Sequence, residues 1–171
     1  MSAEADTDEK GGMTVTIDTF RPEHAAAFDA LNRAWLVAYQ LLEPADELHL
    51  TDPAGHILDP GGEIYVALED HVVIGTCAVV PCGPETFEVV KLAVAPEARG
   101  RRIGRQLVDA CLAYARLKGA RQAVLLSSSR LGAALKLYEQ VGFRHAPMPA
   151  TTPYATADVY MELNLAPRDE K

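Results

Sequence analysis

The stretch that decides the fold runs from Glu88 to Gly119 and reads EVVKLAVAPEARGRRIGRQLVDACLAYARLKG. Residues 88–94 are largely apolar and rich in valine, and Pro96 ends them, which predicts a β-strand. From Ile103 the apolar residues recur at the spacing of an amphipathic helix, and a glycine closes the pattern. The stretch therefore predicts a strand, a tight turn and a long helix.

The turn between this strand and this helix carries four arginines and two glycines. Its residues are Arg99, Gly100, Arg101, Arg102, Ile103, Gly104 and Arg105. Positive charge is disfavoured at a helix N-terminus because that end already carries partial positive charge. A bound polyanion removes the conflict, since free backbone N–H groups and arginines then converge on phosphate oxygens. We interpret the turn as a phosphate cradle; the alternatives are a solvated basic turn and a nucleic-acid-binding patch.

The composition is that of an ordinary globular α/β domain. The chain has 171 residues, of which 49% are hydrophobic and 23% charged, and its formal net charge is −8. This acidic balance argues against nucleic-acid binding, which favours a basic domain. No apolar run approaches the ~18 residues of a membrane span, and the acidic first residues lack the apolar region of a secretory signal. We expect a cytoplasmic protein with no membrane partner.

The cysteines and histidines give no indication of a metal site. Neither the three cysteines nor the five histidines have the spacing of metal ligands. Cys111 falls on the apolar face of the long helix, where a buried free thiol is expected. No metal is therefore predicted.

The rest of the chain reads as one domain over residues 13–166, with a disordered tail at 1–12 and a frayed end at 167–171. The first half predicts a strand at 13–19, a helical region opened by Pro22, and an irregular stretch at 42–62 that shapes a site. A hairpin follows, with strands at 63–68 and 72–80.

The second half predicts a strand at 122–127, a helix ended by Gly142 and a last strand within 158–165. The link between the strand at 88–94 and the strand at 122–127 is long enough for a helical crossover, so these two strands should be parallel. The predicted fold class is α/β (α+β): a mixed sheet whose antiparallel N-terminal half joins a parallel βαβ unit, with helices on both faces.

Over residues 14–165 the chain resembles the GNAT superfamily of N-acetyltransferases. The family pattern [Q/R]-x-x-G-x-[G/A] is matched by Arg99, Ile103 and Gly104, with Arg102 in place of the central glycine. The strand ending Leu92-Ala93-Val94-Ala95-Pro96 and the later run Leu137-Tyr138-Glu139-Gln140-Val141-Gly142-Phe143 also follow the family. The resemblance implies a GNAT-like sheet and coenzyme A bound at the turn.

The same resemblance implies which residues contact acetyl-CoA. They are Leu92, Ala93, Val94, Arg99, Gly100, Arg101, Arg102, Ile103, Gly104, Arg105, Ser128 and Ser129. A serine run occupies the place of an asparagine that in the family often contacts the cofactor. Arginine at position 102 keeps the N–H donor of glycine and adds charge, so we expect binding with an altered geometry. A backbone N–H near 92–94 would bind the developing oxyanion.

Glu88 is the candidate base for removing a proton from the acceptor amine. It begins the central strand on what alternation predicts to be the same face as Val90 and Leu92. Partial desolvation there would raise its pKa and suit it to this role, directly or through water. A glutamate at this place has that role in several members of the resembled family. The alternative is that Glu88 only begins a strand in solvent.

Tyr138 is the candidate acid that protonates the departing thiolate, a role that the resemblance favours over ordinary core packing on an amphipathic helix. Trp35 and Tyr39 are expected to be core aromatics. Glu43, Asp46 and Glu47 cluster in the irregular stretch; they attract a cationic amine or are simply solvated. The segment Tyr154–Asp158 would close the other side of the cleft.

The sequence thus predicts an acetyl-CoA-dependent N-acetyltransferase acting on a primary amine of a small or amino-acid-like molecule within a ternary complex. The alternatives are a non-catalytic acyl-CoA sensor on the same scaffold and, least favoured, a nucleic-acid adaptor. The identity of the amine and the formation of a homodimer are left open.

Overall fold

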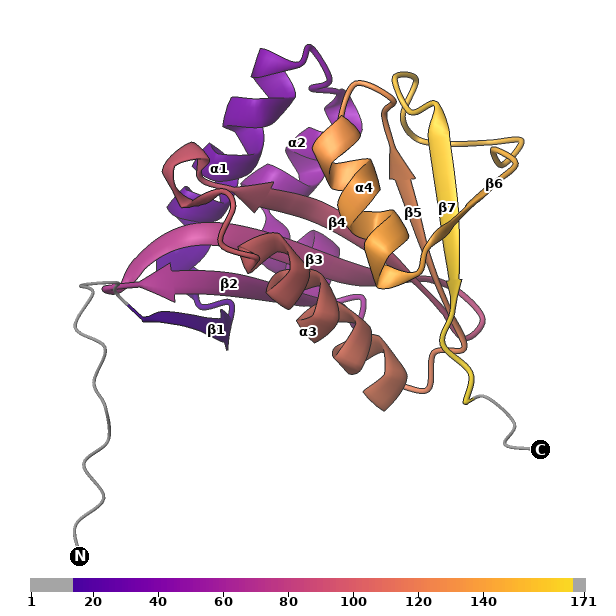
Figure 1. Cartoon of the computed structure of the whole chain (residues 1–171), viewed down its shortest axis with the longest axis horizontal. Coiled ribbons are helices and arrows are strands. Elements are labelled where there is room, and N and C mark those ends of the chain that lie inside the picture. The colour runs from indigo at the N-terminus through magenta and orange to yellow at the C-terminus, as the bar shows by residue number, and fades with distance from the viewer. Residues whose placement is uncertain (1–13, 168–171) are drawn as a thin grey trace, which may run out of the picture.

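The structure of the protein, a computed structural model, describes residues 14–167. These residues form a twisted mixed sheet with helices on both faces, as predicted (Figure 1). The tail expected at 1–12 lies outside the described residues, as do residue 13 and nearly all of the frayed end expected at 167–171.

The sheet has seven strands in the order β1-β2-β3-β4-β5-β7-β6. Their bounds are β1 Val15–Thr19, β2 Glu63–Glu69, β3 Val72–Gly83, β4 Thr86–Val94, β5 Gln122–Ser127, β6 Arg144–Ala146 and β7 Val159–Asn164. β4 and β5 pair in parallel, and the other neighbours pair antiparallel. The parallel crossover predicted from the sequence is therefore confirmed.

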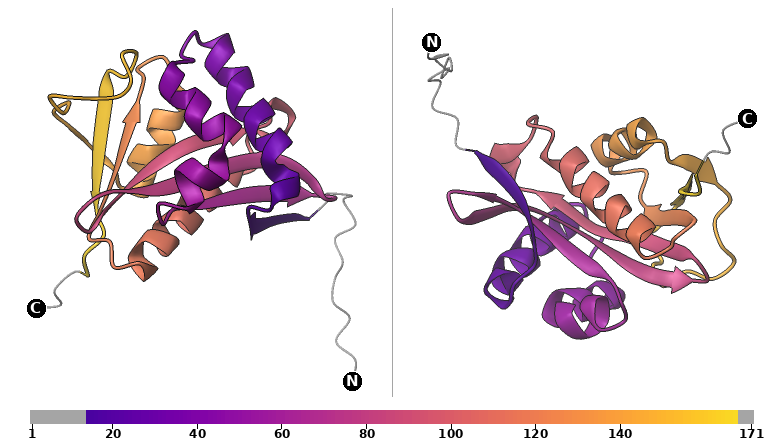
Figure 2. Two further views of the ribbon diagram at one scale, coloured as in Figure 1. Left: turned by 180° about the vertical axis from the view of Figure 1, so that it is seen from behind. Right: turned by 90° about the horizontal axis from the view of Figure 1, so that it is seen from below.

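Two pairs of helices cover the sheet, one pair on each face (Figure 2). Their bounds are α1 Ala25–Ala38, α2 Pro44–Thr51, α3 Ile103–Leu117 and α4 Gly132–Val141. Short helical turns lie at Pro22–His24, Ala54–Leu58 and Pro96–Ala98. α1 and α2 pack over one apolar core, and α3 and α4 over the other. Cys111 of α3 is a fully buried free thiol, as expected.

Two features differ from the prediction. The stretch 42–62 is more ordered than expected, because Pro44 opens α2 and the Asp46 carboxylate accepts a hydrogen bond from the Glu43 N–H at 2.9 Å. β6 was not predicted: three residues are too few to show an alternating pattern, and only their pairing with β7 makes them a strand.

A β-bulge in β4 reverses the faces of the strand. Ala78 of β3 pairs with Val90 and Thr76 pairs with Ala93, so one residue of β3 faces two of β4. Lys91 takes up the extra residue in a left-handed conformation, with φ 56°. Val90 consequently packs on the core under α1 and α2, while Leu92 packs on the core under α3. The expectation that Glu88, Val90 and Leu92 share a face was wrong for Leu92.

β4 and β5 stay together only at their beginnings. Residues 86–88 of β4 pair with residues 122–124 of β5, and the strands then separate (Figure 1). The remainder of β4 keeps its antiparallel pairing with β3 but has no strand on its other side. The backbone of β4 beyond Glu88 is therefore open towards β5.

Candidate active site

A cavity of about 780 Å³ occupies the opening between β4 and β5. Its walls come from segments far apart in the sequence: β4, the turn before α3, the end of β5, α4, the end of α1 and the segment before β7. Residues 88–94 line it along one side. Most of the residues singled out in the sequence thus surround one space, here called the pocket.

One end of the pocket is the arginine-rich turn at the start of α3, here called the cradle. The first N–H groups of a helix have no carbonyl partner within the helix. Among the described residues 14–167, the backbone hydrogen bonds of turns, loops and helix caps also include none whose donor is an amide of residues 101–105. Arg99, Arg102 and Arg105 lie on the wall here, and a Cβ placed on Gly100 would have no heavy atom within 4 Å. Open space, free amides and cationic side chains together fit a diphosphate.

Arg102 holds the conformation that glycine ordinarily supplies. Its φ is 59° and its ψ is 22°, in the left-handed region, where an L side chain costs roughly 1–2 kcal/mol. The residue is the N-cap of α3, and it lines the pocket together with the first helical residues, Ile103–Arg105. The arginine thus keeps the glycine-like backbone and adds a cation to the wall.

Two predicted cofactor ligands point elsewhere. The Arg101 guanidinium pairs with the Glu69 carboxylate at the end of β2 and is not part of the pocket wall. Ser129 binds Asp158 through its N–H at 2.7 Å and its hydroxyl at 2.5 Å. Ser128, in contrast, is buried and does line the pocket. We therefore leave Arg101 and Ser129 out of the proposed cofactor site.

Glu88 lies on the pocket wall at the point where β4 and β5 part. Burial raises the pKa of its carboxyl above the ordinary value, and the positive charge of Lys91 acts in the opposite direction. Within residues 14–167, no ion pair or hydrogen bond engages the Glu88 side chain. A carboxylate of raised pKa with no partner of its own is suited to accept a proton.

Tyr138 belongs both to the core and to the pocket. The residue is 8% exposed, and its ring meets that of Phe143 edge to face at 6.0 Å between centroids. It also lines the pocket. Burial, with smaller contributions from Cys77 and Cys111, raises the pKa of its phenol. The hydroxyl therefore keeps its proton at neutral pH.

The opposite end of the pocket is aromatic. Trp35 of α1, Tyr39 just after α1 and Tyr154 before β7 all line it, together with Leu36, Leu41 and Leu131. Trp35 also packs against the core under α1 and α2, as expected, but the expectation missed its place on the pocket wall and was wrong for Tyr39, which is 43% exposed. The helical spacing of Trp35 with its apolar neighbours cannot distinguish a core from a pocket, and Tyr154 lies in a segment with no periodic pattern.

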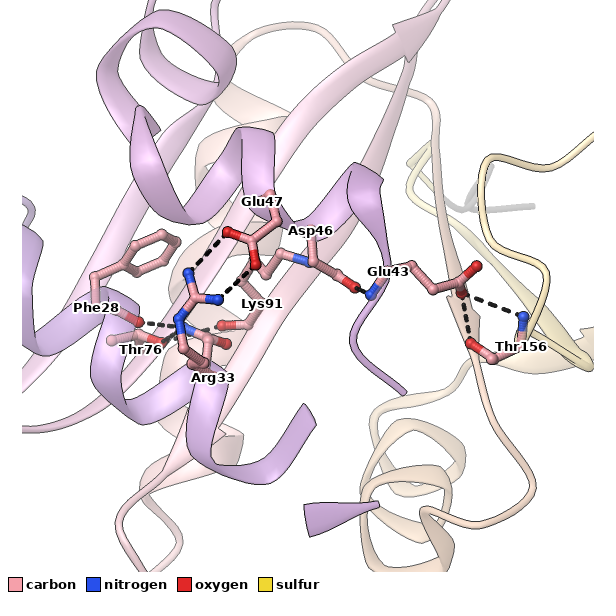
Figure 3. Close-up of polar contacts among 9 residues, drawn as sticks. Phe28, Arg33, Glu43, Asp46, Glu47, Thr76, Lys91 and Thr156 are labelled. Atoms are coloured by element: carbon pink, nitrogen blue, oxygen red, sulfur yellow. Dashed lines mark hydrogen bonds and ion pairs between the residues drawn. The ribbon is translucent and has the colours of Figure 1, made fainter. Parts of the chain in front are cut away.

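The three acids of the 42–62 stretch all have partners within the protein (Figure 3). Asp46 pairs with Lys91, and the two side chains are 3% and 5% exposed. Glu47 binds Arg33 through both carboxylate oxygens, at 2.6 and 3.0 Å. Glu43 binds the segment before β7. Both sequence expectations were therefore wrong: these acids are neither free to attract an amine nor simply solvated.

Glu43 fastens the segment 154–158, here called the strap, over the pocket. Its carboxylate accepts hydrogen bonds from the Ala155 N–H at 2.8 Å, the Thr156 N–H at 3.2 Å and the Thr156 hydroxyl at 2.6 Å. Burial acts to raise the pKa of Glu43, but the bonds from Thr156 and Ala155 outweigh it and leave the pKa lowered. The strap places the Tyr154 ring 5.5 Å from the Lys91 ammonium.

Comparisons with known proteins agree with this architecture. Residues 60–145 match the family described as the acetyltransferase (GNAT) domain. An uncharacterised N-acetyltransferase of Schizosaccharomyces pombe is 32% identical over 125 residues, which are 68% of this chain and 72% of that protein. The N-acetylaspartate synthetase of Mus musculus is 32% identical over 80% of this chain, but only 44% of that protein is covered.

Two solved structures have the same fold. A GNAT-family acetyltransferase from Staphylococcus aureus superposes with a TM-score of 0.82 at 17% identity, over 90% of this chain and 100% of that one. An acetyltransferase from Salmonella typhimurium, solved with acetyl-CoA, gives a TM-score of 0.68 at 21% identity, over 92% and 98% of the two chains.

Proposed function

Because this chain belongs to the GNAT superfamily of N-acetyltransferases, with acetyl-CoA as its acetyl donor, we propose that it acetylates the primary amine of a small molecule within a ternary complex. The observation that supports this most is that the anion cradle at 99–105 and the unpartnered Glu88 carboxyl line one continuous pocket. A thioester bound at the cradle and an amine entering at Glu88 would meet in that space.

The cradle residues fit the cofactor. The amides of 102–105, with Arg99, Arg102 and Arg105, would hold the diphosphate. The open edge of β4 over 92–94 offers backbone groups to the arm that carries the thioester, because no strand pairs with it. Acetyl-CoA supplies the acetyl group in an activated form that the amine nitrogen can attack.

Glu88 would act as the base. An ammonium has no lone pair, so its proton must leave before the nitrogen can bond to the acetyl carbon. The Glu88 carboxylate accepts that proton, directly or through water. As the carbon–nitrogen bond forms and the carbon–sulfur bond breaks, the Tyr138 hydroxyl gives its proton to the departing sulfur. The extra proton left on the nitrogen returns to the Tyr138 oxygen through water, so the products are the acetylated amine and the free thiol. A backbone N–H of 92–94 stabilises the charge on the carbonyl oxygen.

The alternative of a non-catalytic acyl-CoA sensor has no support from the relatives described above, which are named as transferases or as a synthetase. No helix within residues 14–167 is long and apolar enough to cross a membrane. The cytoplasmic location and the homodimer remain predictions.

The test is release of free thiol from acetyl-CoA in the presence of a panel of primary amines. We expect turnover with at least one amine, and Glu88→Gln should lower kcat by about 10²-fold. Glu85→Gln is the matched control, because Glu85 precedes the same strand but its side chain is exposed outside the pocket. Acetyl-CoA binding without thiol release in the presence of any of the amines would favour the sensor, and an unchanged kcat in Glu88→Gln would place the base elsewhere.

A further inference from the structure

The aromatic end of the pocket indicates the chemical class of the acceptor. We infer that the acceptor is an arylalkyl monoamine: a primary amine that carries an aromatic group, no carboxylate and no second charge. The inference rests on the proposed function only in taking the occupant of this end to be an amine. The evidence for it is the aromatic lining of this end of the pocket and the ion-pair or hydrogen-bond partners of the charged side chains there.

The wall offers aromatic surface from three separate segments. Trp35, Tyr39 and Tyr154 come from α1, the α1–α2 connection and the strap, and all three line the pocket that Glu88 also lines. The charge of Glu88 acts on the Tyr154 phenol, so these two side chains are close. Leu36, Leu41 and Leu131 complete this end. Aromatic rings gain from stacking or edge-on contact with another ring in addition to the area that they bury. A substituent with an aromatic ring is therefore the group that this wall complements.

The one cation on the wall at this end, among the described residues, already has a counter-charge. The Lys91 ammonium pairs with Asp46, and both side chains are almost fully buried. The Arg130 guanidinium donates to the Tyr39 carbonyl at 3.0 Å. For Lys91 to bind an acceptor carboxylate, it would have to leave Asp46 as an unpaired buried charge, which is strongly unfavourable. Arg130 is exposed and is not part of the pocket wall, so an amine that also carries a carboxylate would find no free cation on the wall at this end and would face the Glu88 carboxyl.

The anions at this end are engaged in the same way, with one exception. Asp46 is neutralised by Lys91, and Glu43 is saturated by the hydrogen bonds of the strap. Among the described residues that line this end, Glu88 alone keeps a carboxyl without a partner. One carboxylate matches one ammonium. The second charge of a diamine would have to leave water for an apolar wall, which costs affinity.

A matched set of four amines tests each part of the inference. 2-Phenylethylamine is compared with ethylamine, which lacks the ring, with L-phenylalanine, which adds a carboxylate, and with 1,4-diaminobutane, which replaces the ring by a second amine. Binding to the enzyme saturated with coenzyme A is measured by calorimetry, and kcat/KM is measured with acetyl-CoA. We expect 2-phenylethylamine to be favoured over each of the others by about tenfold or more in both measurements.

Variants then locate the effect on the wall. Tyr39→Ala and Tyr154→Ala should reduce the preference for 2-phenylethylamine over ethylamine, while calorimetry shows unchanged coenzyme A affinity. Tyr154→Phe keeps the ring and should restore the preference. The inference is overturned if L-phenylalanine or 1,4-diaminobutane binds as well as 2-phenylethylamine, or if both alanine variants keep the full preference. Acetylation of amino acids in preference to arylalkyl amines would overturn this inference and leave the proposed function standing. Preferential binding of 2-phenylethylamine without thiol release from acetyl-CoA would instead refute the proposed function alone.

Discussion

Lys91 of β4 and Asp46 of α2 form a buried ion pair that joins the central strand to the helix beside the pocket. Asp46 also accepts the Glu43 N–H at 2.9 Å, so the same carboxylate caps α2. Lys91 reaches it because the bulge turns this side chain to the α1–α2 face. A buried charge is tolerated only with its partner, so the two residues depend on each other.

Asp46→Asn should therefore lower the free energy of unfolding by about 3–5 kcal/mol, because it leaves the Lys91 ammonium buried without a counter-charge. Denaturant unfolding measures this. Asp29→Asn, which alters the half-exposed pair of Asp29 with Arg33, is the control and should cost less than about 1 kcal/mol. Replacing both partners, as Asp46→Leu with Lys91→Met, should cost less than Asp46→Asn alone. Equal losses for Asp46→Asn and Asp29→Asn would contradict the dependence.

Arg102 and Arg101 should differ sharply in cofactor binding although they are neighbours. Arg102 lines the cradle, whereas Arg101 is paired with Glu69 outside it. Arg102→Ala should weaken acetyl-CoA binding by about tenfold, close to 1.4 kcal/mol, and reduce its sensitivity to salt. Arg101→Ala should leave the affinity essentially unchanged. Calorimetry at two salt concentrations distinguishes them, and equal effects would mean that the cradle is misassigned.

Arg102→Gly should raise thermal stability even as it removes a cation. The left-handed conformation costs an arginine roughly 1–2 kcal/mol, and the greater freedom of glycine in the unfolded chain offsets about 0.5–1 kcal/mol of the gain. The net expectation is a small increase in the free energy of unfolding. Arg105→Gly is the contrast, because Arg105 is helical and glycine there destabilises by about 1 kcal/mol. A destabilised Arg102→Gly would show that the backbone strain is not relieved.

Glu43→Gln should loosen the strap. The variant loses the charge that receives the bonds from Ala155 and Thr156, so hydrogen exchange of these two amides should be faster than in the wild type. The lowered pKa of Glu43 means that its contribution to stability is present above its ordinary pKa and lost as the pH falls through the lowered folded value. The wild-type strap should therefore loosen in acid. Glu97→Gln, exposed and off the pocket wall, is the control, and unchanged exchange in Glu43→Gln would rule out the clamp.

Glu88 should lower stability at neutral pH. Burial raises the pKa of its carboxyl in the folded state, so the stability that Glu88 contributes is fully present below its ordinary pKa and is lost as the pH rises through the raised value. Glu88→Gln should consequently be more stable than the wild type at pH 7.5, and this advantage should vanish in acid. In the wild type, kcat/KM should rise with pH as Glu88 deprotonates, and this rise should be absent from Glu88→Gln. Unfolding curves at several pH values check the first point; a constant stability difference would contradict the raised pKa.

Most of the fold could be predicted because it depends on local features of the sequence: the spacing of apolar residues, and the prolines and glycines that end strands and helices. The apolar strand before Pro96, the helical repeat after it and the glycine at 142 define their elements without reference to the rest of the chain. The bulge could not be predicted in this way. Nothing in EVVKLAV marks Lys91 as an extra residue, because the bulge exists only in the register between β4 and β3.

In the candidate site, too, local motifs could be predicted, whereas contacts between distant segments could not. Arginines and glycines at a strand-to-helix turn predicted an anion cradle, yet only the position of Glu69 on β2 decided that Arg101 turns away from it. The aromatic end is assembled from Trp35, Tyr39 and Tyr154, which no sequence pattern connects.

The sequence by itself determined the family, and it predicted the cofactor turn and the candidate base, because all three depend on short motifs whose residues are neighbours in the chain. The tertiary structure decided what the charges of the 42–62 stretch do. Asp46 meets Lys91 across 45 residues, and Glu43 meets Thr156 across 113. Whether a carboxylate attracts a ligand or neutralises a partner depends on what lies within a few ångströms of it, and chain folding alone brings such distant partners together.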